Sequence, residues 1–534
     1  MSLTMGAPQD LEERLKSIQY ELLSVPRHSE IKRQAMVDNT PTRRILPERV
    51  PDDVIREIFL ACRPIEGIPT MDTNEIPMAL TRISSRWRSV ALSTPRLWNA
   101  IHIPIVNIET EDNRGRAIMR GRLKEISEWL LWRSGALPLR ISIYQQPHSG
   151  RDNLFVAGVV YVLMKCRARW RYLDLTGTSN LFPLILVDPS SVPLLQGLRI
   201  VCLEDNTDTP DQGLSQDWHT SPILTAPRLQ RLSVISTAIS FSTCQINWSR
   251  LTHLSFANCN SSRNDDHMFT FPALVHVLRR TPQLFSLVFH DAMRQIDLNR
   301  MVIIRGPKIR LPCLEILDVR ESPGVKRASL LHMLDVPSLI DFTYMCNVVV
   351  KCPFPEDDHA TAFQCLLALS SGKIRRLKTN ILHVYSALMN HLHFCPALSI
   401  LELMPHPCIY HPEKQVTIGD NLLDVLSSDD PGRGNPCPKL EYLRCLTHSK
   451  FSSNAIIAFS QQRKLGGDIS GTPKQFILQI GSRAPPDLYL TADNWDPRTF
   501  QLIHERPYMN GIPLPKYPLD LGLDRDLQNC PLVT

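Results

Sequence analysis

The sequence contains little glycine and no apolar run long enough to cross a membrane. It has 22 glycines against 42 prolines, so stiff breaks between short elements outnumber flexible ones. The longest apolar run, residues 154–164, is about half of the roughly 20 residues that a membrane helix needs. Residues 1–16 also lack the apolar core of a signal peptide. We therefore expect neither membrane insertion nor export.

Paired metal-binding cysteines are also missing. The 14 cysteines are scattered and form no Cys-x-x-Cys motif, which favours reduced thiols in a cytoplasmic or nuclear protein. Two groups of metal-ligand residue types, 391–395 and 406–411, contain histidine and cysteine without the paired spacing of a zinc site. We therefore expect no bound metal.

Sequence motifs of catalysis are absent as well. The chain has no Gly-x-x-x-x-Gly-Lys-Ser/Thr loop, no Gly-x-Gly-x-x-Gly loop and no Gly-x-Ser-x-Gly nucleophile motif. We expect no catalytic residues and no cofactor, and the chain is not predicted to be an enzyme.

Positively charged residues slightly outnumber negatively charged ones. The net charge of +6 comes from 59 Lys and Arg against 53 Asp and Glu, spread over a long chain. The basic stretch 114–124 is flanked by acidic residues and lacks interleaved aromatics, which is typical of a solvated helix face. The sequence thus predicts no nucleic-acid partner and no membrane partner.

Periodicity and proline content divide the chain into five segments. These are an N-terminal amphipathic helix (1–40), a helical module (41–102), linking helices with a first strand (103–169), a repeat domain (170–465), and a C-terminal strap with a proline-rich tail (466–534). In the first segment, apolar residues alternate spacings of four and three. This spacing fits one helix packed on its own protein, or a short coiled coil with weak self-association through residues 10–25.

The helical module is the most informative segment. Pro51, Asp52 and Asp53 are typical of a helix start, and an apolar face follows through Cys62. A loop over 64–77 precedes a second helix that is expected near Met78, with Ile83 on its apolar side. A module of this size is marginally stable alone and usually packs on a neighbour or a partner.

Three strings in this module resemble an F-box. Residues 50–59, VPDDVIREIF, match the opening pattern Leu-Pro-x-Glu-(two apolar)-x-x-Ile-Phe, and residues 83–91, ISSRWRSVA, match the second half. Residues 94–98, TPRLW, are similar to the ending found in the expanded fungal branch of the family. Val50, Asp53 and Ser84 replace the usual Leu, Glu and Cys, and Ser84 is expected to replace a small buried group.

The resemblance implies docking to a Skp-type adaptor, which links to a cullin scaffold. It assigns the adaptor-binding role to a set of apolar residues without separating core from interface: Pro51, Val54, Ile55, Ile58, Phe59, Trp87, Val90, Leu97 and Trp98.

A short pattern, apolar-x-x-apolar-x-apolar, recurs from Trp170 onward. In a strand, the last two apolar positions point to one face, and copies must stack because one unit cannot bury its own face. The copies are Trp170/Leu173/Leu175, Leu198/Val201/Leu203, Leu229/Leu232/Val234, Leu251/Leu254/Phe256, Leu284/Leu287/Phe289, Leu314/Leu317/Val319, Leu339/Phe342/Tyr344, Ile374/Leu377/Thr379, Leu398/Leu401/Leu403 and Leu440/Leu443/Cys445.

This pattern resembles leucine-rich repeats. Asn206, Cys259 and Asn347 stand where that family places a turn-binding side chain. Helices are predicted over 272–280, 360–370, 384–394 and 421–427. The fold class is then α+β overall, with a small all-α module followed by an irregular α/β solenoid with a parallel sheet. An ordinary α/β domain with coincidentally similar strands is the alternative.

The two resemblances together predict the substrate-recognition subunit of a ubiquitin ligase. The module would dock the adaptor, and the repeat domain would bind an unknown substrate protein. A non-catalytic interaction scaffold without ligase coupling is the alternative. In the last segment, a strand is predicted over 476–480, and the prolines after it predict irregular chain.

Overall fold

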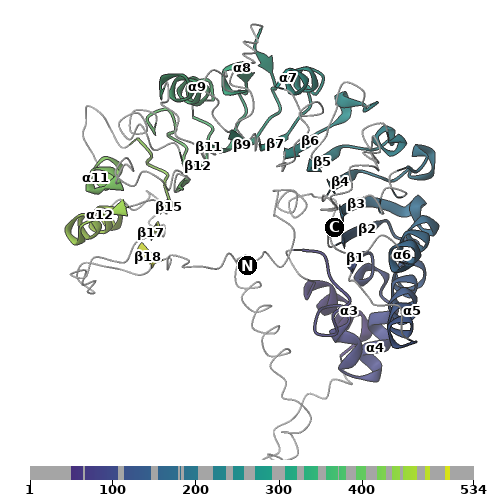
Figure 1. The fold of residues 1–534 in the computed structure, drawn as a ribbon. Coiled ribbons are helices and arrows are strands. Elements are labelled where there is room, and N and C mark those ends of the chain that lie inside the picture. The colour runs from purple at the N-terminus through teal and green to yellow at the C-terminus, as the bar shows by residue number, and fades with distance from the viewer. Residues whose placement is uncertain are drawn as a thin grey trace, which may run out of the picture. The chain divides into compact units, whose positions relative to one another are not determined.

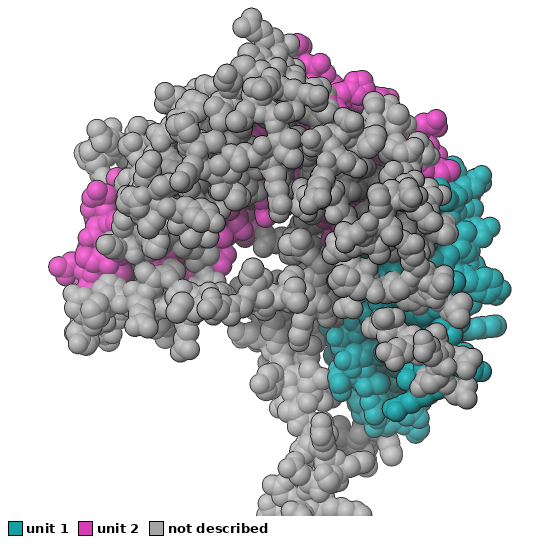
Figure 2. All heavy atoms as spheres, viewed as in Figure 1, with its two compact units in different colours: residues 1–195, 204–208, 523–534 teal, residues 196–203, 209–522 magenta. Residues whose placement is uncertain are grey.

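A computed structural model gives the fold of most of the chain between residues 50 and 504 (Figure 1). The residues described are 50–63, 67–105, 113–145, 154–177, 181, 184, 186–202, 221–235, 245–257, 271–290, 307–321, 330–346, 356–370, 372–380, 392–404, 418–427, 436–445, 449–465, 476–480 and 500–504. The chain forms two compact units, which Figure 2 colours teal and magenta. Unit 1 comprises 1–195, 204–208 and 523–534, and unit 2 comprises 196–203 and 209–522.

Unit 1 begins with short helices. They are α3 (Asp52–Ala61), the 3-10 helix η2 (Ala79–Arg82), α4 (Ser85–Leu92) and the 3-10 helix η3 (Pro95–Leu97). The helix that was expected near Met78 is therefore two helices, because Ser84 adopts an extended conformation and starts α4 anew. Longer helices follow: α5 (Asn113–Ser127), which continues as the π-helix η4 (Glu128–Arg133), and α6 (Leu154–Lys165).

Three parallel strands complete unit 1: β1 (Ala100–Ile105), β2 (Leu139–Gln145) and β3 (Trp170–Gly177), in that order. The pairing aligns Ile101 with Ile141 and Leu173, and all three are buried. Strand β1 was missed by the sequence prediction. It carries the same apolar spacing as β3, with Trp98, Ile101 and Ile103 at the apolar positions, but the pattern was followed only from Trp170 onward.

Unit 2 contains a larger parallel sheet whose strand order follows the chain. Its strands are β4 (Gly197–Cys202), β5 (Arg231–Ile235), β6 (His253–Ala257), β7 (Ser286–His290), β9 (Ile316–Glu321), β11 (Asp341–Cys346), β12 (Arg376–Thr379), β13 (Ile400–Leu403), β15 (Tyr442–Cys445), β17 (Phe476–Ile480) and β18 (Phe500–His504). The sequence prediction of a mixed fold with a large parallel sheet is confirmed.

Helices cover one side of this sheet. Figure 1 shows them on the same side of the strands: α7 (Phe271–Arg279), α8 (Leu330–Met333), α9 (Glu356–Leu369), α11 (Asp420–Ser427) and α12 (Ser453–Leu465). Two short parallel pairs, β8 (Ile309–Arg310) with β10 (Leu334–Asp335) and β14 (Ile418–Gly419) with β16 (Ser449–Lys450), lie among the connections. No helix that the structure describes has both the length and the apolar character of a membrane span.

One buried row of side chains crosses the sheet of unit 2. Leu254 pairs with Leu287, Leu287 with Leu317, and Leu317 with Phe342. The row continues through Leu377, Leu401, Leu443 and Leu478, and each of these side chains is buried. A fully buried leucine contributes about 1.5–3 kcal/mol, so this row is a main source of the cohesion of unit 2.

Tight turns that contain proline precede several of these strands and fix where each of them begins. Leu284 N donates to Thr281 O (3.2 Å), Leu314 N to Leu311 O (3.2 Å), and Leu440 N to Cys437 O (3.1 Å). In each case proline occupies the second turn position, where its fixed φ suits a tight turn. The residues that open these turns are buried. Some of the prolines therefore serve to start strands.

One copy of the apolar pattern was assigned in the wrong frame. In β4 the buried residues are Leu198 and Ile200, which pair with Leu232 and Val234. Val201 is only partly buried, and Leu203 lies outside the described residues. The frame Leu198/Val201/Leu203 was therefore wrong, because two overlapping frames fit the same sequence and only pairing with β5 selects one.

Some of the other predicted helix and strand bounds agree with the structure, and others do not. Strand β17 matches the predicted bounds 476–480, but β18 forms a further strand among the prolines of the last segment, where irregular chain was expected. The helix predicted over 360–370 begins earlier, at Glu356. The N-terminal helix, its self-association segment 10–25, most of the helix predicted over 384–394, and Asn206, Cys259 and Asn347 lie outside the described residues.

We expect Leu401→Ala to lower the stability of the chain, because the truncation leaves a cavity in the buried row, at a cost of about 2–5 kcal/mol. Leu369→Ala is the matched control, since Leu369 lies on α9 and its side chain is exposed. Thermal unfolding of the full chain measures both. If both variants lowered the thermal midpoint equally, the buried row would not be a main source of the stability of unit 2.

Candidate functional site

The helical module of unit 1 is closed by a polar contact between its two main helices. Pro51 precedes α3, and Asp52 and Asp53 occupy the first turn, where carboxylates favour the positive end of the helix. Arg86 of α4 reaches back to the same end, with its Nη2 2.6 Å from Asp52 Oδ1. This pair fixes the start of α3 against the start of α4.

Aromatic rings fill the space beneath the two helices. The ring of Phe59 lies 4.9 Å from that of Trp87. Trp98 Nε1 donates to the carbonyl of Ala91 (2.8 Å), and the ring of Trp98 meets Trp129 edge-on at 4.8 Å. Because Trp129 belongs to η4, the module packs on the longer helices of unit 1 and does not stand alone.

The structure separates the predicted adaptor-binding residues into core and surface. Five of them are buried: Ile55, Phe59, Val90, Leu97 and Trp98. Ile58 and Trp87 are partly buried, and Pro51 and Val54 are exposed. The buried residues hold the module together and present no surface to a partner. Only the remaining four are placed to contact one.

Two exposed apolar side chains of the module were not among the predicted set. Ile83 is 51% exposed and Leu92 is 39% exposed, which compares with 47% for Val54. Ile83 was expected on the buried side of the second helix, but it precedes α4 and points to solvent. Leu92 follows the buried pair Val90 and Ala91 and is turned away from them by the helical period, a signal that could have identified it.

Ser84 stands where the F-box family usually has a small buried Cys. It is exposed, and its Oγ accepts a hydrogen bond from Trp87 N at 3.1 Å. It therefore caps α4, a role for which serine is among the preferred residues.

A second polar group lies in the sheet of unit 1. His102, Ser142 and Asp174 occupy one row across β1, β2 and β3. His102 Nδ1 lies 3.0 Å from Ser142 Oγ, and Ser142 Oγ donates to Asp174 Oδ2 at 3.3 Å. Nucleophilic catalysis needs the imidazole between hydroxyl and carboxylate, whereas here the hydroxyl stands in the middle. No sequence motif marks this group, because strand pairing alone brings its three residues together.

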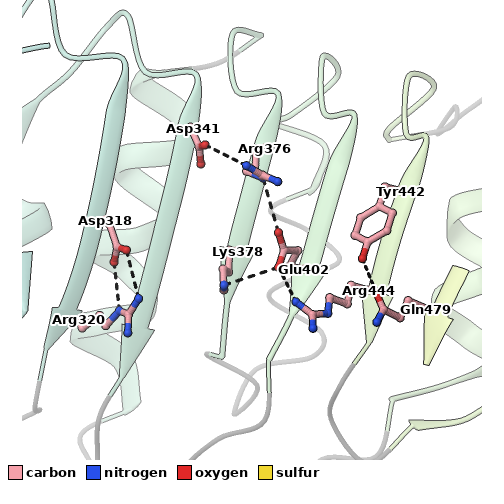
Figure 3. Close-up of polar contacts among 9 residues, drawn as sticks. All are labelled: Asp318, Arg320, Asp341, Arg376, Lys378, Glu402, Tyr442, Arg444 and Gln479. Carbon is pink, nitrogen blue, oxygen red and sulfur yellow. Dashed lines mark hydrogen bonds and ion pairs between the residues drawn. The ribbon is translucent and has the colours of Figure 1, made fainter. Parts of the chain in front are cut away.

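The third group is a set of charged side chains on the strands of unit 2 (Figure 3). Glu402 of β13 lies among three cations: Arg444 Nη1 is 3.4 Å from its Oε2, Arg376 Nε is 3.6 Å from Oε1, and Lys378 Nζ is 3.7 Å from Oε2. Arg376 Nη1 also lies 3.6 Å from Asp341 Oδ2. We call these five residues the Glu402 cluster.

The Glu402 cluster stands on the strand positions that alternate with the buried row. Lys378, Glu402, Arg444 and Gln479 pair in register, and Tyr442 hydrogen-bonds to Gln479 beside them. Since neighbouring residues of a strand point to opposite faces, these side chains lie on the face opposite the buried row. On β12, β13 and β15 the face opposite the buried row, which we call the open face, is therefore polar and charged.

Asp318 and Arg320 extend this face toward the start of unit 2. Burial alone would raise the pKa of Asp318, but the hydrogen bond and charge of His290, together with Arg320, outweigh it and hold the pKa below its ordinary value. Arg320 Nη2 lies 3.4 Å from Asp318 Oδ2. This carboxylate therefore stays charged and matched by its neighbours.

Buried thiols and metal-ligand residues form no further site among the described residues. Burial raises the pKa of Cys395 to about 12 and raises that of Cys445 as well, so both thiols stay protonated. In the part of the chain that the structure describes, no three His, Cys, Asp or Glu side chains gather as a metal ion would require. Residues 391 and 406–411 lie outside that part.

Comparisons with known proteins add no family to this picture. The chain matches no protein-family model and no curated protein. Interpretation of the module and of the charged face therefore rests on their own residues.

We expect the stability of unit 1 to fall on mild acidification because of His102. Burial lowers the pKa of His102, although Asp174 and Glu75 act in the opposite direction. The unfolded chain, with a histidine pKa of about 6.5, then binds a proton before the folded chain does. This contribution is present above about pH 6.5 and is lost as the pH falls from there through the folded pKa.

His102→Gln removes the titration and keeps a side chain that can hydrogen-bond to Ser142. The thermal midpoint of the natural chain should fall more than that of the variant between about pH 7.5 and pH 5. The same fall in both would show that His102 does not carry the pH dependence.

Proposed function

We propose that this chain is the substrate-recognition subunit of a Skp–cullin–F-box type ubiquitin ligase. In this proposal the helical module docks a Skp-type adaptor, and unit 2 is a leucine-rich-repeat-like solenoid that binds the substrate protein. The chain performs no bond chemistry itself. It raises the concentration of a substrate near the ubiquitin-conjugating machinery, which acts through proximity.

The observation that carries the proposal is the exposed apolar set Val54, Ile83 and Leu92 on a module whose interior is already filled. Phe59, Trp87 and Trp98 satisfy the packing inside the module, so the three exposed side chains are not needed to close its core. A contiguous apolar patch on the surface of a small helical module favours a protein partner, and in this proposal these three side chains form one. The strings that resemble an F-box contain Phe59, Trp87 and Trp98 of the core and the exposed residues Val54 and Ile83, and Leu92 directly follows the second string.

The arrangement of unit 2 supports the second half of the proposal. Its parallel strands follow chain order, its buried row repeats from strand to strand, and helices cover one side. These are the features that stacked structural repeats produce. The opposite face of the strands is then left to recognise another protein.

We expect Val54→Asp and Ile83→Asp each to weaken adaptor binding by about tenfold or more, because each places a charge in an apolar contact. The natural full chain should co-purify with the Skp-type adaptor at equal stoichiometry. Ile118→Asp is the matched control, since Ile118 is similarly exposed on α5, outside the module, and should leave binding unchanged.

Phe59→Asp should also abolish binding, but by a different route. Phe59 is fully buried, so a carboxylate at this position disrupts the module. Far-ultraviolet circular dichroism and thermal unfolding separate this variant from the two surface variants, which should unfold as the natural chain does. If the natural chain does not bind the adaptor, or if both surface variants bind normally, the ligase assignment fails and a scaffold without ligase coupling takes its place.

A further inference from the structure

On the open strand face of unit 2, the Glu402 cluster carries more positive than negative charge. In the Glu402 cluster, three cations, Arg376, Lys378 and Arg444, share two carboxylates, Asp341 and Glu402. Glu402 is recessed, with 9% of its side chain exposed, whereas the three cations keep 25–29% of theirs exposed. Asp341 is as exposed as the cations, at 30%. Three cations and one carboxylate therefore form the accessible part of the cluster, and its net charge is positive.

The ion pairs within the cluster leave donors available. The three distances to Glu402 are 3.4–3.7 Å, longer than the 2.7–2.9 Å of a well-formed charge-assisted hydrogen bond. Arg376 Nε is inaccessible and faces Glu402 Oε1 at 3.6 Å without a hydrogen bond, so a partner would have to reach the rest of the guanidinium, in a side chain that is 27% exposed. A guanidinium has five donors in a fixed fork that suits carboxylate and phosphate oxygens, so Arg376 has more donors than these loose pairs satisfy.

We propose that the Glu402 cluster binds an acidic segment of a partner protein, whose carboxylate or phosphoryl groups contact Arg376, Lys378 and Arg444. In this proposal the recessed carboxylate of Glu402 competes with the partner's anionic groups for the three cations, and it lowers the affinity of the cluster for the peptide. The surroundings fit an extended peptide, because Tyr442 and Gln479 continue the same face and Asp318 is already matched by Arg320 and His290.

This inference deepens the proposed function, since it names the chemistry of the substrate. It concerns residues of unit 2 only, whereas adaptor binding concerns the helical module. Failure of one is therefore distinguishable from failure of the other. Neighbouring strands are about 4.8 Å apart, so the distance from β9 to β17 is crossed by about seven extended residues at about 3.3 Å each.

The test is fluorescence anisotropy of the full chain with a labelled peptide of about ten residues, composed of glutamate and serine. Binding should occur and should weaken with rising salt, because exposed charges are screened. Arg376→Glu combined with Lys378→Glu should weaken binding by about tenfold or more. Arg280→Glu is the matched control, since Arg280 is exposed just after α7, away from the strand face, and should bind as the natural chain does.

Glu402→Gln provides a readout of opposite sign. It removes the competing carboxylate, so the peptide should bind several-fold more tightly, although the fold loses three ion pairs. A merely structural role for Glu402 predicts a less stable chain without tighter binding. This variant keeps the proposal testable even if the double reversal unfolds unit 2.

Several outcomes would overturn the proposal. They are absence of peptide binding by the natural chain, equal weakening by Arg280→Glu, or unchanged or weaker binding by Glu402→Gln. A single-stranded oligonucleotide that binds more tightly than the acidic peptide, through Arg376 and Lys378, would also overturn it and would identify a nucleic-acid face instead.

Discussion

The side chains of Leu254, Leu287 and Leu317 pack in one buried row, and the rest of unit 2 depends on this contact. A parallel sheet with its strands in chain order keeps such a row only if every strand holds the same register. A slip of one residue would turn leucine outward and a charged residue inward. The proline turns before the strands help to prevent such a slip, since they place the first apolar residue of each strand at a fixed position.

Because of this register, the two faces of each strand carry different kinds of side chain. Leu401 and Leu403 of β13 are buried, while Glu402 between them meets the cations of neighbouring strands. Stability therefore comes from one face, and the proposed recognition falls to the other. A change on the charged face alters charge without removing the buried row, which suits the proposed selection of a partner.

The sequence predicts best those features that depend on neighbours along the chain. Pro51, Asp52 and Asp53 mark the start of α3, and the apolar spacing locates most strands of the sheet. Prediction failed where pairing decides, as in β4, where Leu198 belongs to two frames that both fit the pattern. It also failed at β1, whose apolar spacing Trp98/Ile101/Ile103 was overlooked although the strand is paired along its whole length.

The candidate site was less predictable than the fold, for the same reason. Spacing put Ile55, Phe59 and Val54 together as apolar residues of one helix, but burial depends on what packs against that helix. Trp87 comes from the next helix and covers Phe59, while Val54 stays exposed. The Glu402 cluster was not foreseen, because its members come from four strands that are distant in sequence and adjacent only in the sheet.

Hydrogen–deuterium exchange of the full chain with and without the Skp-type adaptor tests the central claim most directly. The account predicts that the adaptor slows exchange in α3, α4 and the segment between them, and leaves the strands of unit 2 unchanged. A mixture that shows no protection in the module, or protection only along the strands of unit 2, would contradict the division of labour between adaptor docking and substrate recognition.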